Sequence, residues 1–171
     1  MKRTLPLAVL VVIFTCGPVS AQNAREIGFD FRVTDQDSIG VTWHLTNRFA
    51  FRPLLTYDSL EVEVFNPFFG PIRERARVYG TDLGFLFTVH SHENLNLYTG
   101  AALQYSYTNV DQGSDIHSKG AEALFGMRFM FAKRLGIFSE VGARYRKDSS
   151  GNDLTTYGLF TGGLGLTIYV N

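Results

Sequence analysis

Four adjacent residues carry the groups that a hydrolytic site would need. His90-Ser91-His92-Glu93 supplies one hydroxyl, two imidazoles and one carboxylate within a single short stretch. Nucleophilic catalysis requires a hydroxyl or thiol next to a base that a third group orients. Here the stretch falls on a tight link between two segments with strand character, and no rigid element lies beside it to hold the groups in place. We therefore interpret it as a polar turn.

A second set with chemical potential lies farther along, where His117-Ser118 precedes Glu122. His44 stands apart from both sets, and it falls on the polar face of a predicted strand, where it would serve as a hydrogen-bonded interior residue. The four histidines are scattered, without the regular spacing of metal ligands. We therefore predict no catalytic residue, no metal site and no cofactor.

The N-terminus has the features of a secretory signal peptide. Lys2 and Arg3 precede an apolar run at residues 5–14, and Gly17-Pro18 then interrupts it before the small-residue site Val19-Ser20-Ala21. The run is shorter than the roughly 20 apolar residues that span a bilayer, which disfavours a retained anchor. Lipid attachment at Cys16 is disfavoured because the bulky Thr15 precedes it. We predict a signal peptide at residues 1–21 and one domain at residues 22–171.

The composition of the remaining chain excludes several classes of protein. The 16 basic and 16 acidic side chains of the whole chain balance, and Lys2 and Arg3 are the charges that leave with the signal peptide. The rest is slightly acidic, which argues against a nucleic-acid partner. The single cysteine, Cys16, also leaves. The mature chain therefore has no disulfide and no thiol chemistry.

Nearly all of the mature sequence alternates between apolar and polar residues with a period of two, which is the signature of β-strands. Eight such runs lie at residues 27–34, 39–45, 49–57, 79–89, 97–107, 121–131, 137–145 and 160–170. The links between them alternate in length. Those after the second, fourth and sixth runs are short, whereas the others, at residues 35–38, 58–76, 108–118 and 146–155, are mostly longer and polar. Short turns at one end and longer loops at the other are typical of outer-membrane barrels.

The two faces of these runs indicate which side meets lipid. A lipocalin-like soluble barrel would turn its apolar face inward and place many lysines on its outer face, but the mature lysines are only Lys119, Lys133 and Lys147, all in links or at strand ends. The apolar face is too bulky to fit inside eight strands, whereas the polar face is rich in glycine. Tyrosines near the long-link ends fit an interfacial girdle; they are Tyr57, Tyr79, Tyr105, Tyr107 and Tyr145. The sequence therefore predicts an eight-stranded antiparallel up-and-down transmembrane β-barrel.

Charged side chains on the polar face form a balanced set. Its acids are Asp30, Asp82, Glu122 and Glu140, and its bases are Arg32, Arg52, Arg128 and Arg144. Inside a narrow barrel these groups must pair, because an uncompensated buried ion is strongly destabilising. We predict a closed, ion-paired lumen and no open channel.

The chain resembles the small outer-membrane β-barrels of the OmpX and OmpA transmembrane-domain type over roughly residues 25–171. The resemblance rests on the signal peptide, the eight runs, the Arg/Glu lumen and two turn-adjacent stretches, Leu45-Thr46-Asn47-Arg48-Phe49 and Glu93-Asn94-Leu95-Asn96-Leu97-Tyr98-Thr99-Gly100. It implies a monomer in the bacterial outer membrane that contacts lipid and lipopolysaccharide, and that reaches the membrane through periplasmic chaperones and the assembly machinery. Members commonly end on an aromatic residue, whereas this chain ends on Asn171.

The link at residues 58–76 is the part of the chain that the barrel explains least. It continues the alternation at Leu60, Val62 and Val64, which predicts a hairpin projecting beyond the membrane, and it carries a set of aromatic and basic side chains. That set is Phe65, Phe68, Phe69, Arg73, Arg75 and Arg77. The segment either packs over the barrel mouth or offers a contact surface for lipopolysaccharide, a host surface or a partner protein.

Three classes of function follow from this reading. The preferred one is a structural or surface-interaction barrel with a closed lumen. The second is a small pore. The third is a lipid A-modifying enzyme, since some eight-stranded barrels are acylases or deacylases; however, Ser118 directly follows His117, which departs from the His-x-Ser spacing of the deacylases.

Overall fold

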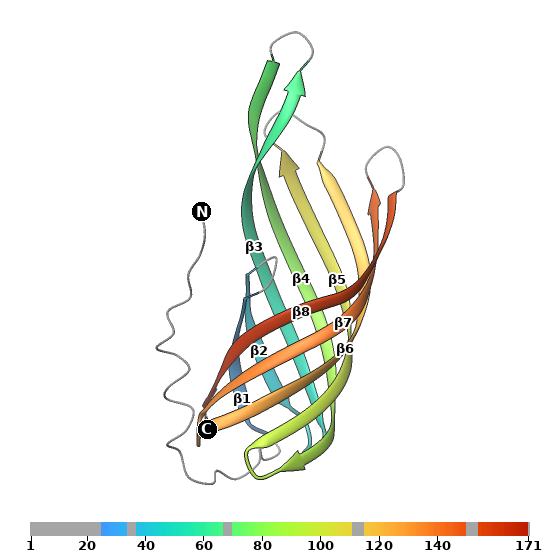
Figure 1. Ribbon diagram of the computed structural model, residues 1–171. Helices are drawn as coiled ribbons and strands as arrows, with labels where there is room; N and C mark the ends of the chain where they lie inside the picture. Colours follow the sequence, from blue (N-terminus) through green and yellow to red (C-terminus); the bar gives the residue numbers. More distant parts are fainter. Residues whose placement is uncertain (1–24, 34–36, 67–69, 111–114, 150–153, 171) are drawn as a thin grey trace.

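The computed structural model describes residues 25–33, 37–66, 70–110, 115–149 and 154–170. They form a closed barrel in which each strand pairs with its neighbour in sequence and β1 pairs with β8 (Figure 1). The strands are β1 (Ile27–Val33), β2 (Ser38–His44), β3 (Phe49–Asn66), β4 (Gly70–His92), β5 (Leu95–Val110), β6 (Ile116–Ala132), β7 (Leu135–Ser149) and β8 (Leu154–Val170). All the pairs are antiparallel, so the predicted eight-stranded antiparallel barrel is confirmed. The predicted signal peptide, residues 1–21, lies outside the described residues.

The register places the predicted apolar face on the outside of the barrel. In β1 the burial alternates strictly, with Ile27, Phe29 and Phe31 exposed and the residues between them buried. Strand pairing carries this pattern around the wall, because directly paired residues share a face: Phe29 pairs with Val41 on one side and with Ile168 on the other. A shift of one residue in register would move every side chain of a strand to the opposite face. The alternation therefore fixes which residues share a face, and the outer face is assigned from the solvent that the barrel wall meets.

The strands differ greatly in length, from 7 residues in β1 and β2 to 23 in β4. The β3–β4 ladder runs without interruption from Phe49↔Phe87 to Asn66↔Gly70, and the two strands rise well above the rest of the barrel (Figure 1). The predicted hairpin extension is therefore present. Treating residues 108–118 and 146–155 as loops was largely wrong, because β5, β6, β7 and β8 continue through most of them. In these segments the backbone N–H and C=O groups form hydrogen bonds across the strands in place of hydrogen bonds to water.

The other end of the barrel carries tight turns. At the β2–β3 turn the Thr46 hydroxyl oxygen accepts hydrogen bonds from the backbone N–H groups of Arg48 (3.2 Å) and Phe49 (3.0 Å). The β4–β5 turn consists of Glu93 and Asn94, and Glu93 has a left-handed backbone with φ of 47°. The histidine-rich stretch that the sequence analysis assigned to this turn thus belongs mostly to the last residues of β4.

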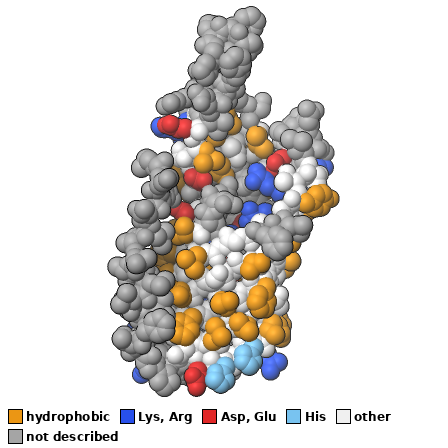
Figure 2. Space-filling view, viewed as in Figure 1, with side chains coloured by type: hydrophobic (Ala, Val, Ile, Leu, Met, Phe, Trp, Pro, Cys, Tyr) orange, Lys and Arg blue, Asp and Glu red, His pale blue; other side chains and the backbone are white. Residues whose placement is uncertain are grey.

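The outer wall of the barrel is apolar. Figure 2 shows hydrophobic side chains spread over the wall below the mouth, with charged and histidine side chains at the lower rim. Leu55, Phe85 and Leu103 are 62%, 57% and 61% exposed, which are values that a water-facing strand rarely gives to such residues. Exposed tyrosines lie toward the mouth and pair across strands, Tyr57 with Tyr79 and Tyr145 with Tyr157. Within the described ranges, no helix is both long and apolar enough to cross a membrane.

Candidate functional site

The eight charged residues predicted for the lumen all lie inside the barrel, and each is at most 8% exposed except for Arg144, which is half-buried. They come from β1, β3, β4, β6 and β7, and polar residues of β2, β5 and β8 complete their contacts. Every strand therefore contributes at least one side chain to a single interior network. The network has three layers, which follow one another from the turn end to the mouth.

Asp30 anchors the layer nearest the turns and is fully buried. The hydroxyls of Thr42 and Thr167 donate hydrogen bonds to its two carboxylate oxygens. The guanidinium of Arg128 lies 3.9 Å from the same carboxylate and donates a hydrogen bond to the hydroxyl of Tyr169. Asp30 is thus held by strands β1, β2, β6 and β8 together, which ties the first and last strands of the closed barrel to its opposite wall.

His44 belongs to this layer as well. Its Nε2 lies 3.2 Å from the Tyr169 hydroxyl and 3.5 Å from Arg128 Nη1. This is the predicted role of a hydrogen-bonded interior residue. Among the described residues, no three His, Cys, Asp or Glu side chains are grouped so as to hold a metal ion.

Glu140 is the centre of the middle layer. Arg52 donates to its two carboxylate oxygens at 2.6 and 3.0 Å, in the bidentate geometry that gives the strongest pairs. The Tyr98 hydroxyl donates a third hydrogen bond at 2.8 Å, and Arg32 Nη1 lies 3.6 Å away. Arg52 is 1% exposed. This layer reaches across the barrel from β3 to β7.

Arg32 links the middle layer to the upper one, because its Nη2 also lies 3.8 Å from Asp82. Gln104 donates from its amide to both Asp82 (3.3 Å) and Glu122 (2.8 Å). Glu122 also accepts hydrogen bonds from Thr161 at 2.7 Å and from Arg144 at 3.4 Å. The two arginine–carboxylate contacts of this layer, at 3.8 and 3.4 Å, are longer than those of Arg52 with Glu140.

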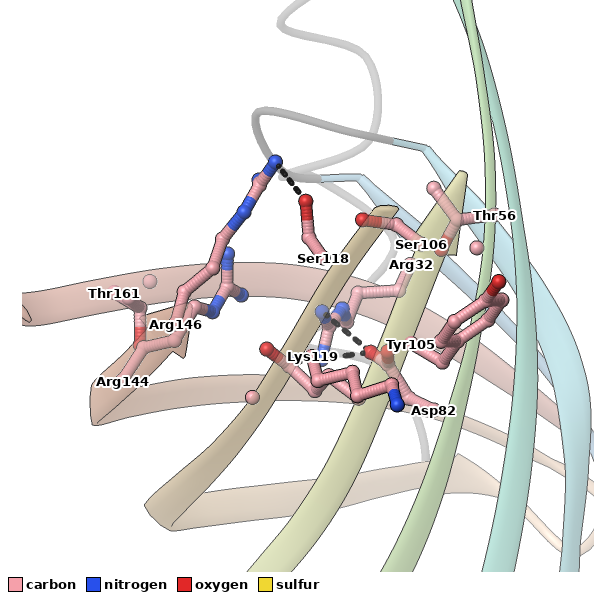
Figure 3. A pocket seen from close by; sticks show the side chains of 14 residues that line it. Arg32, Thr56, Asp82, Tyr105, Ser106, Ser118, Lys119, Arg144, Arg146 and Thr161 are labelled. Carbon is pink, nitrogen blue, oxygen red and sulfur yellow. Dashed lines mark hydrogen bonds and ion pairs between the residues drawn. The ribbon is translucent and has the colours of Figure 1, made fainter. Parts of the chain in front are cut away.

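Above the upper layer, the interior opens into a pocket of about 260 Å³ at the mouth. Figure 3 shows Arg32 directed at Asp82 on its floor, and Arg146 directed at Ser118 on its wall. Arg146 donates to Ser118 at 2.8 Å and to Asp148 at 2.6 Å. Of the basic side chains that line the pocket, Arg32, Arg144 and Arg146 each lie within ion-pairing distance of an acid.

Three inward-facing aromatic rings were missed by the sequence analysis, namely Tyr98, Phe138 and Tyr169, each at most 3% exposed. Arg128 lies over all three, 5.5 to 5.8 Å from the ring centroids, so that cation–π contacts supplement its single carboxylate. The sequence contained the signal for them, because each lies two residues from a residue of the polar face and so shares that face. The neighbours are Gly100 for Tyr98, Glu140 for Phe138 and Thr167 for Tyr169.

Glycines make room for these rings. A Cβ atom on Gly126 would lie 2.5 Å from the Tyr98 ring, and one on Gly28 would lie 2.9 Å from the Tyr169 ring. A Cβ on Gly165 would overlap the Phe138 ring. These three glycines of the polar face therefore have a specific cause, since each leaves the space that one large inward-facing ring occupies.

The second chemical cluster of the sequence is split by the barrel wall. Ser118 is buried and faces the lumen, where it accepts from Arg146, whereas His117 is exposed on the outer surface beside Tyr105. Glu122 faces the lumen and is occupied by Arg144 and Thr161. The hydroxyl, imidazole and carboxylate therefore do not meet. In the first cluster, Ser91 donates to Asn96 at 2.6 Å, while His90 and His92 are exposed.

The residues predicted as a contact surface lie along the β3–β4 extension. Phe68 and Phe69 lie outside the described residues. Phe65 pairs with Pro71 and Arg73 with Glu63 in the ladder. Arg75 is exposed and lies 3.7 Å from Glu61, its partner across the hairpin, and Arg77 is half-buried.

Solved structures share this fold, although no family model and no curated protein matches the chain. The N-terminal β-barrel domain of OprF from Pseudomonas aeruginosa matches with a TM-score of 0.52 and 15% identity, over 87% of this chain and 100% of that one. Neisserial surface protein A matches with a TM-score of 0.50 and 15% identity, over 84% and 92% of the two chains. CarO of Acinetobacter baumannii has a TM-score of 0.44 and 12% identity, over 88% and 100%. The first two likenesses show that the fold is that of small outer-membrane β-barrel proteins.

Proposed function

We propose that this chain resides in the bacterial outer membrane as a barrel with a closed lumen, and that it acts through the surface that its β3–β4 extension presents outside the membrane. The observation that carries the proposal is the distribution of side chains between the two faces of the wall, which is the reverse of that in a soluble β-barrel. The charged and hydrogen-bonding side chains fill the inside, and the largest apolar side chains face outward.

The reversed faces favour a lipid surrounding over water. Soluble monomers rarely expose contiguous apolar patches larger than a few hundred Å², whereas outward apolar side chains on this barrel follow the wall from strand to strand. In a bilayer the same surface is satisfied by acyl chains. The tyrosine pairs near the mouth then lie at the level of the headgroups.

The closed interior favours a structural or surface role over a pore. The bidentate Arg52–Glu140 pair and the cluster around Asp30 lie across the barrel at two successive depths. An ion passing through would have to displace buried partners and leave charges uncompensated, at a cost of several kcal/mol. We therefore expect no sustained conductance.

The β3–β4 extension supports a role in surface interaction. It exposes Leu60 and the side chains of Glu61 and Arg75 far from the barrel wall, where they contribute nothing to the closed interior. A long ladder that binds nothing would offer an unpaired edge to other strands, which is a liability that proteins usually avoid. Lipopolysaccharide and the surface of another cell are the partners that such a projection would reach.

Two measurements test this function. The refolded protein should give no stable channel in a planar bilayer. A variant that lacks residues 60–75 should refold to a barrel of nearly unchanged stability, because a change in link length has a small entropic cost, and should lose binding to immobilised lipopolysaccharide or to cultured epithelial cells. A variant with the β7–β8 link shortened serves as the control. A steady conductance, or identical binding by all three proteins, would contradict the proposal.

A further inference from the structure

A row of hydroxyl side chains follows the inner wall of the barrel at its mouth. Cross-strand pairing joins one residue from each of the successive strands β2 to β6 into this row, namely Ser38, Thr56, Gly80, Ser106 and Ser118. Directly paired residues share a face, and the two ends of the row, Ser38 and Ser118, are buried. Four hydroxyls therefore lie at one depth of the lumen.

This row contributes to one side of the pocket at the mouth. Figure 3 shows Thr56, Ser106 and Arg32 on one side of the pocket, and Arg144 and Thr161 on the other. The volume of about 260 Å³ corresponds to on the order of nine water molecules, at about 30 Å³ each. A single sugar ring with its hydroxyl groups is of this size, whereas a longer chain would not fit.

Several hydrogen-bonding atoms at this depth are not used by the protein. Within the part of the chain that the structure describes, Arg32 Nε, Arg144 Nε and Ser38 Oγ are buried and have no hydrogen-bond partner. The Nε atoms of the deeper Arg52 and Arg128 are in the same state, but only Arg32 and Arg144 line the pocket. The side chain of Arg32 is 8% exposed, and a buried donor without an acceptor is costly. A ligand in the pocket would supply the missing acceptors.

The arginines of the pocket already have acidic partners. Arg32 lies 3.8 Å from Asp82 and Arg144 lies 3.4 Å from Glu122, and the third arginine of the lining also pairs with a carboxylate. An anionic ligand would have to compete with these carboxylates, whereas an uncharged ligand displaces no ion pair. Because a hydroxyl both donates and accepts hydrogen bonds, it matches guanidinium donors and serine or threonine hydroxyls alike. The pocket therefore suits an uncharged ligand with several hydroxyl groups.

We propose that this pocket binds one uncharged pyranose ring, which is either a free sugar or the terminal unit of a glycan outside the cell. The sugar hydroxyls accept hydrogen bonds from Arg32 and Arg144 and exchange hydrogen bonds with Thr56 and Ser106. The buried pair of the middle layer, in which Arg52 holds a carboxylate at 2.6 and 3.0 Å, lies beneath the pocket. The ring therefore binds at the mouth and does not cross the barrel. This site is separate from the β3–β4 extension, so the inference goes beyond the proposed function.

The test uses the refolded protein in a detergent that has no sugar headgroup. The probes are the methyl glycosides of glucose, galactose, mannose and N-acetylglucosamine, and saturation-transfer NMR reports their binding. At least one of the four should bind with a Kd on the order of 1 mM, as expected for a ligand of about twelve heavy atoms. The corresponding glucuronate and glucosamine derivatives, which carry a charge, should bind more weakly. Lack of binding by all four neutral sugars, or tighter binding of a charged derivative, would overturn the proposal.

Two matched double variants assign the binding to the pocket. Thr56→Val/Ser106→Ala removes two hydroxyls of the pocket and leaves every charge in place, so it should weaken sugar binding about tenfold, since two hydrogen bonds are lost. Thr99→Val/Ser59→Ala makes the same two substitutions at exposed positions outside the pocket lining and should keep the affinity of the unmodified protein. Equal affinities of the two double variants would show that the sugar binds elsewhere and would overturn the assignment.

A further comparison identifies the source of the sugar. A disaccharide that ends in the ring that binds best should bind with similar affinity if the natural ligand is the end of a glycan, and should not bind if the pocket takes a free sugar. The outcome for this site is independent of the outcome for the proposed function. A protein that shows the heat-dependent gel shift of a folded barrel but binds no sugar would refute this site alone, whereas a soluble protein without that shift would refute the proposed function.

Discussion

Replacing Glu140 with leucine should be among the most destabilising single changes in the barrel. Its carboxylate accepts hydrogen bonds from Arg52 at 2.6 and 3.0 Å and from Tyr98 at 2.8 Å, and it lies 3.6 Å from Arg32. The side chains of Arg52 and Arg32 are only 2% and 8% exposed. Glu140→Leu therefore leaves Arg52 buried without its carboxylate and Arg32 with Asp82 alone, and neither can reach water without opening the barrel.

The magnitude follows from these contacts. Removal of one partner from a buried ion pair costs about 3–5 kcal/mol of unfolding free energy, and we expect Glu140→Leu to fall in this range. Glu140→Gln keeps one oxygen as an acceptor for Arg52 or Tyr98 but loses the charge, so its cost should be smaller, about 2 kcal/mol. The double variant Arg52→Met/Glu140→Leu removes both members of the pair and should recover at least half of the loss, since apolar replacements of a whole buried pair are well tolerated.

The assay is equilibrium unfolding in urea of the protein refolded into lipid vesicles. The single tryptophan, Trp43, lies 50% exposed on the outer wall and reports unfolding by fluorescence. Glu61→Leu is the matched control, because Glu61 is 65% exposed and pairs with Arg75 at 3.7 Å, a surface contact worth about 0–1 kcal/mol. If Glu140→Leu cost no more than this control, or if the double variant were less stable than Glu140→Leu alone, the assignment of a buried, mutually dependent network would be refuted.

Two further changes test the two faces of the wall. Phe85→Arg places a charge on the outward row of β4, where Phe85 is 57% exposed, and should cost about 2–4 kcal/mol in vesicles at midplane depth; no loss would mean that this row does not face lipid. Gly126→Ala should lower the urea midpoint of unfolding markedly or prevent refolding, because the new Cβ atom would lie 2.5 Å from the Tyr98 ring. Gly162→Ala is the control and should leave the midpoint nearly unchanged, because the nearest atom to its Cβ would be 3.8 Å away. Equal effects at the two glycines would show that the inward tyrosine does not explain the need for a glycine at position 126.

The order of the strands and the two faces of the wall could be predicted from the sequence, because a period of two forces alternate residues onto opposite faces. Phe29, Phe85 and Leu103 were assigned to the outside on this basis, and the structure places them there. The ends of the strands were predicted less well. Polar segments such as residues 108–110 and 116–118 were predicted as parts of loops, because the sequence of a solvated strand does not differ from that of a solvated link until its partner strand is known.

The contacts inside the lumen could not be predicted in detail. Balance of charge predicted that the four acids and four arginines would share the interior, but which of them pair depends on the stagger of strands around the closed barrel. Glu140 and Arg52 lie 88 residues apart in sequence and meet only through that closure. The inward rings of Tyr98, Phe138 and Tyr169 were overlooked because aromatic residues were attributed to the lipid face, although their positions in the two-residue alternation assigned them to the lumen.

Cell fractionation tests the proposal that this chain is a lipid-facing barrel in the outer membrane. Cells that express the full chain are separated into soluble, inner-membrane and outer-membrane fractions, and each fraction is run on a gel with and without boiling. The protein should be found in the outer-membrane fraction and should migrate faster when unboiled, because a closed barrel has no unpaired edge through which detergent can unfold it. Recovery in the soluble fraction, with identical migration before and after boiling, would show that the chain is not a lipid-facing barrel.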